Sequence, residues 1–411
     1  MARQLDSLRY AAPRPAANQL HDDVESTGGL LDPRYAWGPA TGHEQGGGIM
    51  KVGFLAAPMH PFESYRMVVA IAEQAKVDSV WVPDHLLGCA HPALWPDMAL
   101  AAMSPDADAW YDPFPCIGMI GQESELPMGV CVTDAIRRRA PDVVRTALTL
   151  HQLCRGGFHL GVGAGEAENL VPFGYDFSTP VAELEDFLIE LRELLDRGVM
   201  PSGSSARVGL PLQRDDLGPP KVWVAGHGPR MLRLTGEYGD GWVPAWAMSP
   251  SSYGERRRAI AKHADRAGRP VPECALMIPV IVGESRSHVA ELMERDPLGK
   301  LSALMSPAES WAKYGLKHPS GDQCRGLVDL VFHDLDPEQL RELAPTIPFE
   351  LVEEYTFTGN ATEIVDRVSE YANNGLEHVI LGNATGTVGG LDEINANTGQ
   401  LRAVVAALRE L

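Results

Sequence analysis

The chain of 411 residues carries 35 Lys and Arg against 55 Asp and Glu, which gives a formal net charge of −20 and a pI near 5.0. This acidic balance excludes the clustered positive charge that nucleic acids and anionic membrane surfaces attract, so neither is expected as a partner. No apolar run reaches the roughly 18 residues of a membrane-crossing helix, and an integral membrane segment is not expected.

The six cysteines form neither a C-x-x-C pair nor a Cys/His spacing typical of metal sites. They stand at Cys89, Cys116, Cys131, Cys154, Cys274 and Cys324. This usage predicts reduced, mostly buried thiols, no metal site and a cytoplasmic location. The basic run at residues 137–139 lies beside an expected helix and is interpreted as a solvated face.

Residues 1–48 are polar, are broken by several prolines and by three consecutive glycines, and show no period of 2 or 3.6. They are predicted to form a disordered or loosely attached tail, because they offer too little apolar surface for a core. Residues 49–411 are assigned to one folded domain.

Beyond the tail, short β-branched or apolar runs alternate with helical stretches. The expected strands are 51–57, 79–83, 127–133, 158–162, 221–225, 241–244, 275–282 and 378–382. The clearest expected helices are 62–76, 141–154, 181–196, 229–238, 251–267, 361–373 and 391–409. Eight strands separated by helices predict an α/β fold, a (β/α)8 TIM barrel, with a doubly wound open sheet as the alternative.

Residues 296–356, between expected strands seven and eight, are too long for an ordinary connection and contain Pro, Trp and Tyr. They are predicted to form an insertion over the mouth of the barrel. Active sites of such barrels lie at the carboxyl ends of the strands, so the residues that follow each apolar run carry the functional prediction.

Polar side chains follow the second and third expected strands. Asp84 and His85 come directly after the second, and an imidazole at a strand end can exchange a proton with a substrate oxygen. A histidine bonded to a neighbouring loop carbonyl is the alternative. Thr133 and Asp134 follow the third strand, where a helix cap or turn is the alternative role.

The fourth strand runs into a glycine-rich turn, Gly161, Gly163 and Gly165, which delivers Glu166 at the strand end. The spacing G-x-G-x-G does not match the G-x-G-x-x-G of a dinucleotide fold. We expect the turn to let a cofactor ring approach while it presents Glu166, for which a salt bridge to a loop is the alternative.

The fifth strand leads into the turn Gly226–Arg230, which is followed by a helix. Glycine amides, a helix N-terminus and an arginine together predict a phosphate cradle. A tight strand-to-helix turn that happens to hold an arginine is the alternative.

Five motifs, taken in order, resemble the luciferase-like monooxygenase superfamily, and most of all its branch that uses the deazaflavin coenzyme F420. They are Val82–His85, Gly129–Thr133, Gly161–Asn169, Val224–Pro229 and Gly239–Gly241. The likeness spans about residues 50–411 and leaves the tail unexplained.

The resemblance implies roles for individual residues. His85 would exchange a proton with the substrate oxygen while the deazaflavin ring passes a hydride, and Glu166 would serve the ring-nitrogen side. Val132 matches a bulge of the third strand, often with a non-proline cis peptide, that supports the ring. Asp84, Thr133, Asp134 and Asn169 match positions near the ring and its polyol, and His227, Gly228, Arg230 and Met231 match the phosphate turn.

The chain departs from a sugar-phosphate dehydrogenase of the same branch. Cys89 stands where that enzyme has a Trp, and Met248 stands where it has a phosphate-binding Lys, while Trp95 is a candidate replacement for the aromatic ring. With Trp242 and Trp246 near the end of strand six, the pocket is expected to take an apolar, lipid or polyketide substrate.

The reaction expected from the resemblance is hydride transfer between reduced F420 and a ketone or secondary alcohol. An FMN-dependent luciferase-like monooxygenase is the first alternative, and a binding protein without turnover is the second. The likeness also implies a homodimer.

Overall fold

The computed structural model describes residues 49–203, 205–211, 214–245 and 248–411. The tail predicted at residues 1–48 and the predicted pocket residue Trp246 therefore lie outside the described residues.

The described strands form one parallel sheet that closes into a barrel. They are β1 (Lys51–Leu55), β2 (Ser79–Val82), β3 (Met128–Asp134), β4 (Phe158–Gly163), β5 (Val222–Val224), β6 (Gly241–Trp242), β7 (Glu273–Val282), β8 (Phe357–Gly359) and β9 (His378–Asn383). The order β6-β5-β4-β3-β2-β1-β9-β7 returns to β6 through a β6–β7 pairing. The predicted TIM barrel is confirmed, and the open sheet is excluded because the β6–β7 pairing closes the other eight described strands into a ring.

The eight expected strands are those of the barrel wall, and β8 is an extra strand that the sequence did not reveal. It pairs in parallel with Val280–Val282, at the end of β7. The short β6 pairs with β7 only at Glu273 and Cys274, so β8 takes over the same side of β7 further along. Three residues are too few to show a strand period, which is why the pattern missed it.

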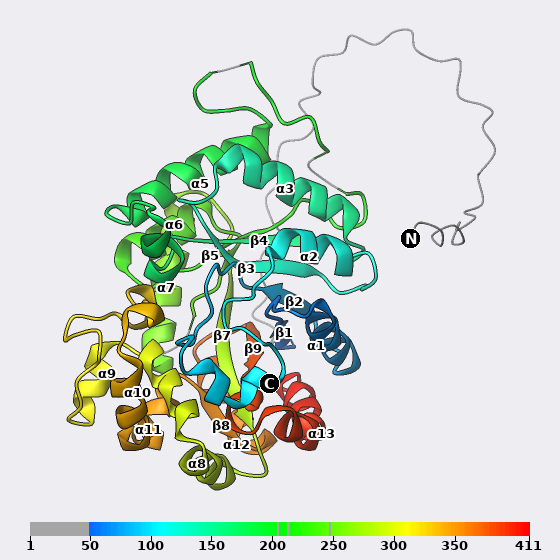
Figure 1. The fold of residues 1–411 in the computed structure, drawn as a ribbon. Helices are drawn as coiled ribbons and strands as arrows, with labels where there is room; N and C mark the ends of the chain where they lie inside the picture. The colour runs from blue at the N-terminus through cyan, green and yellow to red at the C-terminus, as the bar shows by residue number, and fades with distance from the viewer. Residues whose placement is uncertain (1–48, 204, 212–213, 246–247) are drawn as a thin grey trace, which may run out of the picture. The chain divides into compact units, whose positions relative to one another are not determined.

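Helices surround the barrel, as Figure 1 shows. The α-helices are α1 (Phe62–Gln74), α2 (Pro113–Ile120), α3 (Ala140–Leu153), α4 (Ala167–Leu170), α5 (Pro180–Arg197), α6 (Pro229–Tyr238), α7 (Pro250–Arg266), α8 (Arg286–Arg295), α9 (Ala308–Lys313), α10 (Pro337–Leu343), α11 (Phe349–Glu353), α12 (Ala361–Ala372) and α13 (Gly390–Leu408). The short 3-10 helices are η2 (Trp95–Asp97), η3 (Ala99–Ala102), η4 (Val171–Phe173), η5 (Pro297–Met305), η6 (Gly326–Val328), η7 (Phe332–Asp334), η8 (Ala344–Thr346) and η9 (Thr385–Val388).

Strand alternation sorts the side chains into two cores. In β2, Val80 and Val82 face the helices and belong to the main core, whereas Trp81 points into the barrel. Trp81 and Trp223 meet edge to face with ring centroids 5.2 Å apart, and both are almost completely buried. These large rings fill the barrel, so its interior is a packed core rather than a channel.

A polar cluster closes the amino-terminal end of the barrel. Nδ1 of His378 lies 3.3 Å from Oε1 of Glu273, and the Nε2 atom lies 3.2 Å from the Ser79 hydroxyl. Lys51 donates to the same Glu273 carboxylate at 3.0 Å. Because these residues begin β7, β9, β2 and β1, the cluster lies at the end of the barrel opposite the site described below.

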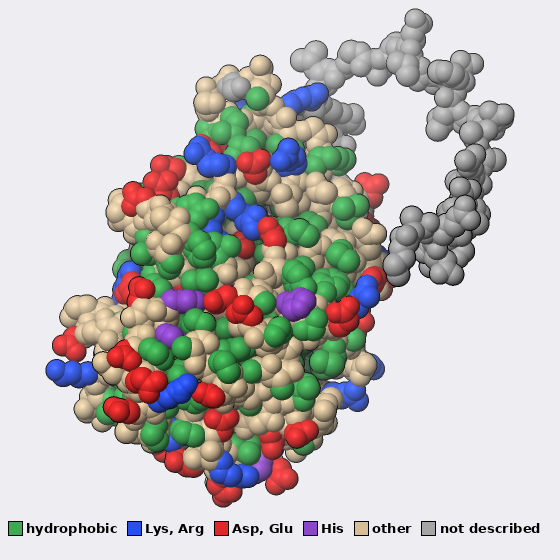
Figure 2. Space-filling view, viewed as in Figure 1, with side chains coloured by type: hydrophobic (Ala, Val, Ile, Leu, Met, Phe, Trp, Pro, Cys, Tyr) green, Lys and Arg blue, Asp and Glu red, His purple; other side chains and the backbone are tan. Residues whose placement is uncertain are grey.

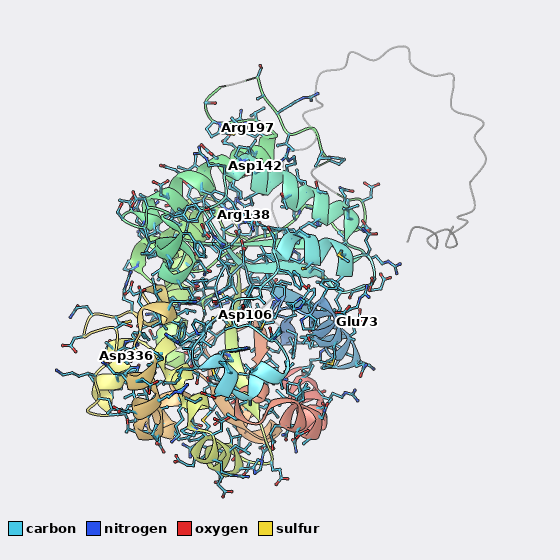
Figure 3. The ribbon with its side chains drawn as sticks, viewed as in Figure 1. Glu73, Asp106, Arg138, Asp142, Arg197 and Asp336 are labelled. Atoms are coloured by element: carbon cyan, nitrogen blue, oxygen red, sulfur yellow. The ribbon has the colours of Figure 1, made fainter. Side chains whose placement is uncertain are left out.

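The insertion after β7 folds into short helices around its own apolar core. Leu304, Trp311 and Leu351 are fully buried there, packed with Leu94 from the connection between β2 and α2. In Figure 1 the yellow and orange helices α9, α10 and α11 gather on one side of the barrel. Figure 3 labels one residue of each segment, Asp106 in the connection after β2 and Asp336 in the insertion.

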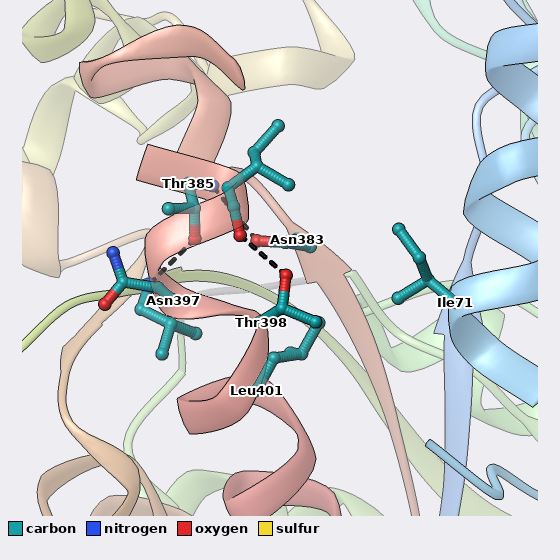
Figure 4. Close-up of a pocket in the computed structure, with 8 residues that line it drawn as sticks. Ile71, Asn383, Thr385, Asn397, Thr398 and Leu401 are labelled. Atoms are coloured by element: carbon teal, nitrogen blue, oxygen red, sulfur yellow. Dashed lines mark hydrogen bonds between the residues drawn. The ribbon is translucent and has the colours of Figure 1, made fainter. Parts of the chain in front are cut away.

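A small cavity of about 10 Å³ lies between α1, α13 and the end of β9, lined by residues that include Ile71, Asn383 and Leu401 (Figure 4). A space of this size holds about one water molecule, so it does not serve as a substrate site.

Charges are mixed over the face that Figure 2 shows, where Lys and Arg side chains stand among Asp and Glu. Across the described ranges, no helix is both long and apolar enough to cross a membrane.

Candidate active site

His85 lies between two carboxylates at the carboxyl end of the barrel, where the segments that follow β2 and β4 come together above β3. Its Nε2 atom is 3.6 Å from Oε2 of Glu166, and its Nδ1 atom is 3.0 Å from Oε1 of Glu168. The imidazole follows β2 by three residues, and both carboxylates follow β4 at the start of α4. The structure thus brings together the two residues predicted to be catalytic.

Glu168 is a site residue that the sequence reasoning missed. Its side chain is 1% exposed, and its second oxygen, Oε2, has no hydrogen-bond partner within the described part of the chain. A buried carboxylate is costly unless it is paired, and its partner here is the imidazole. The spacing Glu-Ala-Glu was visible, but only the fold shows that the second carboxylate turns inward.

Cys89 completes a compact group around Nδ1 of His85. Its sulfur lies 3.9 Å from that nitrogen and 3.8 Å from Oε1 of Glu168. Burial and the nearby Glu168 raise the pKa of Cys89 to about 11, so the thiol keeps its proton at neutral pH. The three ligand-type atoms lie within 4.8 Å of one another.

Asn169 ties the two loops of the site together. Its side-chain oxygen accepts a hydrogen bond of 2.7 Å from the Leu86 amide, next to His85. Its amide nitrogen lies 3.5 Å from Oε2 of Glu166. The predicted cofactor residue Asn169 therefore also sets the spacing between the imidazole and Glu166.

Trp110, from the connection after β2, packs on the imidazole. The centroids of its ring and of His85 are 5.3 Å apart with an interplanar angle of 34°. Its indole nitrogen donates to the Ala107 carbonyl at 2.9 Å, which fixes the ring. Trp95, the aromatic replacement expected from the sequence, packs instead with Ala90 and Ala107.

The surroundings perturb both titrating groups. Burial disfavours the charged imidazole, but Cys89, Glu168 and Glu166 outweigh that effect and hold the pKa of His85 well above its usual range. Burial raises the pKa of Glu166 to about 7, against the opposing effect of His85. A charged imidazole beside a carboxyl group that titrates near neutral pH is typical of proton-transfer sites.

Asp84 and Thr133 belong to a buried network beneath the site. The Thr133 hydroxyl donates to Oδ2 of Asp84 at 2.7 Å, and Arg138 donates to the same oxygen at 3.1 Å. Arg137 binds the Asp84 carbonyl oxygen at 2.7 Å and also pairs with Asp134. Both predicted carboxylates are therefore already engaged by guanidinium groups.

The interpretation of residues 137–139 as a solvated face is wrong for Arg137, whose side chain is only 7% exposed. The charge run looked like a surface because the sequence does not show that Asp84 and Asp134 face it from neighbouring strand ends. Figure 3 labels Arg138, the second arginine of this network.

β3 is irregular where the resemblance predicted a bulge. Its pairing with β4 shifts register between Val130 and Thr133, and the peptide bond between Cys131 and Val132 is cis. Val132 is partly buried and packs against the cluster that fills the barrel.

The glycines of β4 serve this bulge. A Cβ at Gly161 would lie 2.2 Å from the Val130 carbonyl oxygen, and one at Gly163 would lie 3.0 Å from a Val132 methyl. Their small size therefore lets β3 approach, whereas the sequence analysis expected them to admit a cofactor ring. Only Gly165, with φ +92°, requires glycine for its backbone conformation.

The turn before α6 offers an open helix start. Among the described residues, no atom lies within 4 Å of the place a Cβ would take at Gly228, and the first helical bond runs from the Leu232 amide to the Gly228 carbonyl. The amides of Arg230 and Met231 precede that bond and point out of the helix start. The Arg230 guanidinium, however, binds Glu185 at 2.7 Å, so it is held by α5.

His227 lies in the same turn. Burial and Arg256 lower the pKa of His227 to about 4, so its ring is neutral at physiological pH. Met231 packs over Gly226, where a Cβ would lie 2.6 Å from the methionine. Phosphate contacts at this turn would therefore rest on backbone amides more than on charged side chains.

The luciferase-like monooxygenase family matches residues 40–378 of this sequence. The chain belongs to the luciferase-like monooxygenase family.

Its relatives within the curated proteins include ketone and alcohol oxidoreductases. The chain is 36% identical over 355 residues to the phthiodiolone/phenolphthiodiolone dimycocerosates ketoreductase of Mycobacterium tuberculosis, covering 82% of this chain and 93% of the relative. It is 28% identical to an F420-dependent glucose-6-phosphate dehydrogenase of Beutenbergia cavernae, covering 75% and 84%. This luciferase-like chain is an oxidoreductase.

Among solved structures, the chain is similar to an F420-dependent secondary alcohol dehydrogenase in complex with an F420-acetone adduct. The TM-score is 0.62 with 21% sequence identity, and the match covers 87% of this chain and 99% of that chain. At this identity the similarity shows the shared barrel fold.

At the end of β6, where the sequence predicted a substrate pocket, Met248 and Trp242 contact side chains of α7. The Met248 sulfur accepts a contact of 3.1 Å from Arg256 on α7, and Trp242 stacks on Tyr253 with centroids 5.0 Å apart. Trp242 is fully buried in the main core, so its assignment to the pocket is wrong. Because β6 has only two residues, the sequence showed no alternation from which to tell whether Trp242 faces the barrel interior or the helices.

Proposed function

We propose that this chain is a coenzyme F420-dependent oxidoreductase that transfers a hydride between the reduced deazaflavin and a ketone or secondary alcohol of an apolar substrate. The observation that carries the proposal is the imidazole of His85, which Glu168 holds at Nδ1 at 3.0 Å while Glu166 stands 3.6 Å from Nε2. This arrangement places a proton donor at a strand end, and the imidazole can transfer the proton without a metal ion.

The described residues fit a ring-bearing phosphorylated cofactor. The bulge at Val132 would support the ring, and the open helix start at Gly228 would receive a phosphate through the amides of Arg230 and Met231. The deazaflavin, when bound, supplies hydride chemistry and little reactivity toward oxygen.

The chain's own residues then handle the proton. Glu168 fixes the imidazole so that Nδ1 faces the buried carboxylate and Nε2 remains for the substrate oxygen. Because the pKa of His85 is held well above its usual range, the ring carries its proton at neutral pH. Glu166, with a pKa raised to about 7, can take up or release a proton beside it.

The named activities of relatives support the same reaction class. A ketoreductase at 36% identity favours a carbonyl substrate, and an F420-dependent dehydrogenase at 28% identity favours the deazaflavin. An FMN-dependent monooxygenase is the second candidate, because the family is named for luciferase-like monooxygenases.

A titration of the purified chain with F420 and, separately, with FMN tests the proposal. We expect tighter binding of F420, and oxidation of reduced F420 when an apolar ketone is added. Tighter binding of FMN, with oxygen consumed on reduction, would overturn the proposal in favour of the monooxygenase.

A further inference from the structure

A cavity of about 170 Å³ lies beside the candidate active site, and Cys89, whose sulfur is 3.8 Å from Oε1 of Glu168, lines it. One wall is the connection after β2, and the other is the insertion, mainly η5. The cavity is thus enclosed mainly by the two long segments that follow β2 and β7.

Its lining is almost entirely apolar. The side chains that define it include Ala90, Leu94, Trp95, Met98, Leu301 and Leu304. Of the residues that the structure describes, no Asp, Glu, Lys or Arg lines it. An apolar cavity of about 150 Å³ already holds a benzene-sized molecule, so this one has room for a short stretch of hydrocarbon.

The cavity reaches two side chains that contact the catalytic histidine. Cys89 and Trp110 line it, and both also contact His85, at 3.9 Å for the sulfur and 5.3 Å between ring centroids. An alkyl chain whose carbonyl oxygen lies at the imidazole would enter the cavity beside these two side chains.

Ionic contacts hold the two walls together. Arg341 of α10 pairs with Asp97 at 2.6 Å, and Nε2 of His333 lies 2.8 Å from Asp108. The Asp108 carboxylate also accepts from the Gly88 amide at 2.8 Å, next to Cys89. The cavity is consequently pre-formed, which lowers the ordering cost of a flexible ligand.

We propose that this cavity binds the aliphatic chain of the ketone substrate, so that the substrate class is an alkyl ketone with a hydrocarbon chain short enough to fit this cavity, or the corresponding secondary alcohol. The inference rests on the proposed function and deepens it, because it moves the substrate pocket from the end of β6 to the space between the β2 connection and the insertion.

A homologous series of methyl ketones from 2-butanone to 2-undecanone tests the assignment. The value of kcat/KM rises about fourfold per methylene until the cavity is full, since each buried methylene contributes a constant increment. The variants Ala90→Leu and Ser302→Leu, one from each wall, stop this rise at shorter chains and leave 2-butanone unchanged.

Met248→Phe is the matched control, because it enlarges an apolar side chain at the end of β6. It is expected to keep the wild-type dependence on chain length. Melting temperatures show whether the variants fold, and the two walls provide independent variants if one does not. A profile shortened by Met248→Phe but unchanged in Ala90→Leu and Ser302→Leu would place the chain at β6 and overturn the inference.

Equilibrium dialysis of 2-undecanone against the protein without reductant separates this inference from the proposed function. Binding that weakens at least tenfold in Ala90→Leu and Ser302→Leu supports the cavity even if no ketone is reduced, in which case only the proposed function fails. Reduction of all ketones with one chain-length profile in every variant would refute the cavity and leave the proposed function standing.

Discussion

Oε1 of Glu168 lies 3.0 Å from Nδ1 of His85, and the carboxylate is 1% exposed. A buried carboxylate at this distance stabilises the charged imidazole and selects the tautomer with a proton on Nδ1. Glu168 thereby acts as a positioning residue for His85, while Glu166 stands near the opposite ring nitrogen at 3.6 Å.

Glu168→Gln is expected to lower the pKa of His85, because the amide cannot stabilise the imidazolium as the carboxylate does. Ketone reduction needs the protonated imidazole, so the alkaline limb of the kcat/KM profile moves to lower pH. On that limb each unit of pKa shift lowers the rate tenfold. Steady-state kinetics across pH measure the shift.

Glu350→Gln is the control for this charge change, since that side chain is 59% exposed on α11 of the insertion, where it pairs with Arg286. It should leave the pH profile of kcat/KM unchanged.

Dialysis against EDTA should leave the activity unchanged, because the group of His85, Cys89 and Glu168 is interpreted as a proton network. A loss of activity that Zn²⁺ restores would contradict that interpretation.

His85→Asn removes the proton donor but keeps a polar side chain of similar size. We expect kcat for ketone reduction to fall by about 10²- to 10⁴-fold, the usual contribution of general acid catalysis. The affinity for F420, measured by fluorescence titration, should change little. A variant with wild-type kcat would remove His85 from the mechanism.

Glu166 has a pKa raised to about 7, so it loses its proton as the pH rises through neutrality. In ketone reduction it is expected to accept a proton, and kcat/KM should therefore rise with pH up to about 7. Glu166→Gln abolishes this acid limb and leaves the alkaline limb. An acid limb that persists in the variant would assign it to another group.

The barrel and the positions of its strand ends could be predicted from the sequence because hydrophobic runs and helix periods are local properties. His85 and Glu166 were found since each directly follows such a run. Their separation of 3.6 Å could not be predicted, because it depends on how β2 and β4 are placed around the barrel.

Side-chain direction is what the sequence did not show. Glu168, for which the sequence predicted no role, turns toward His85. Trp242, which was expected near the pocket, turns into the main core. Arg137 resembles a surface residue until Asp84 and Asp134 meet it from two strand ends. These are contacts between distant segments, and no local pattern encodes them.

Trp110→Leu tests whether the aromatic ring positions His85. Loss of the ring packed at 5.3 Å frees the imidazole, and we expect kcat with 2-butanone to fall about tenfold, because small misplacements of a catalytic group are costly. Trp110→Phe keeps a ring face and should recover most of kcat. Equal losses in both variants would indicate that the indole N–H bond to Ala107 matters more than the ring.

Thr133→Val tests the buried network beneath the site. The substitution preserves the shape of the side chain but removes the 2.7 Å hydrogen bond to the Asp84 carboxylate. Hydrogen bonds to charged groups contribute about 1.5–3 kcal/mol, so the free energy of unfolding should fall by that amount. Thr346→Val removes a hydroxyl bond of 2.7 Å to the Leu343 carbonyl at an exposed position, and it should cost less than about 0.5 kcal/mol. Denaturant midpoints of the two variants compare them directly, and equal losses would show that Asp84 is held by Arg137 and Arg138 alone.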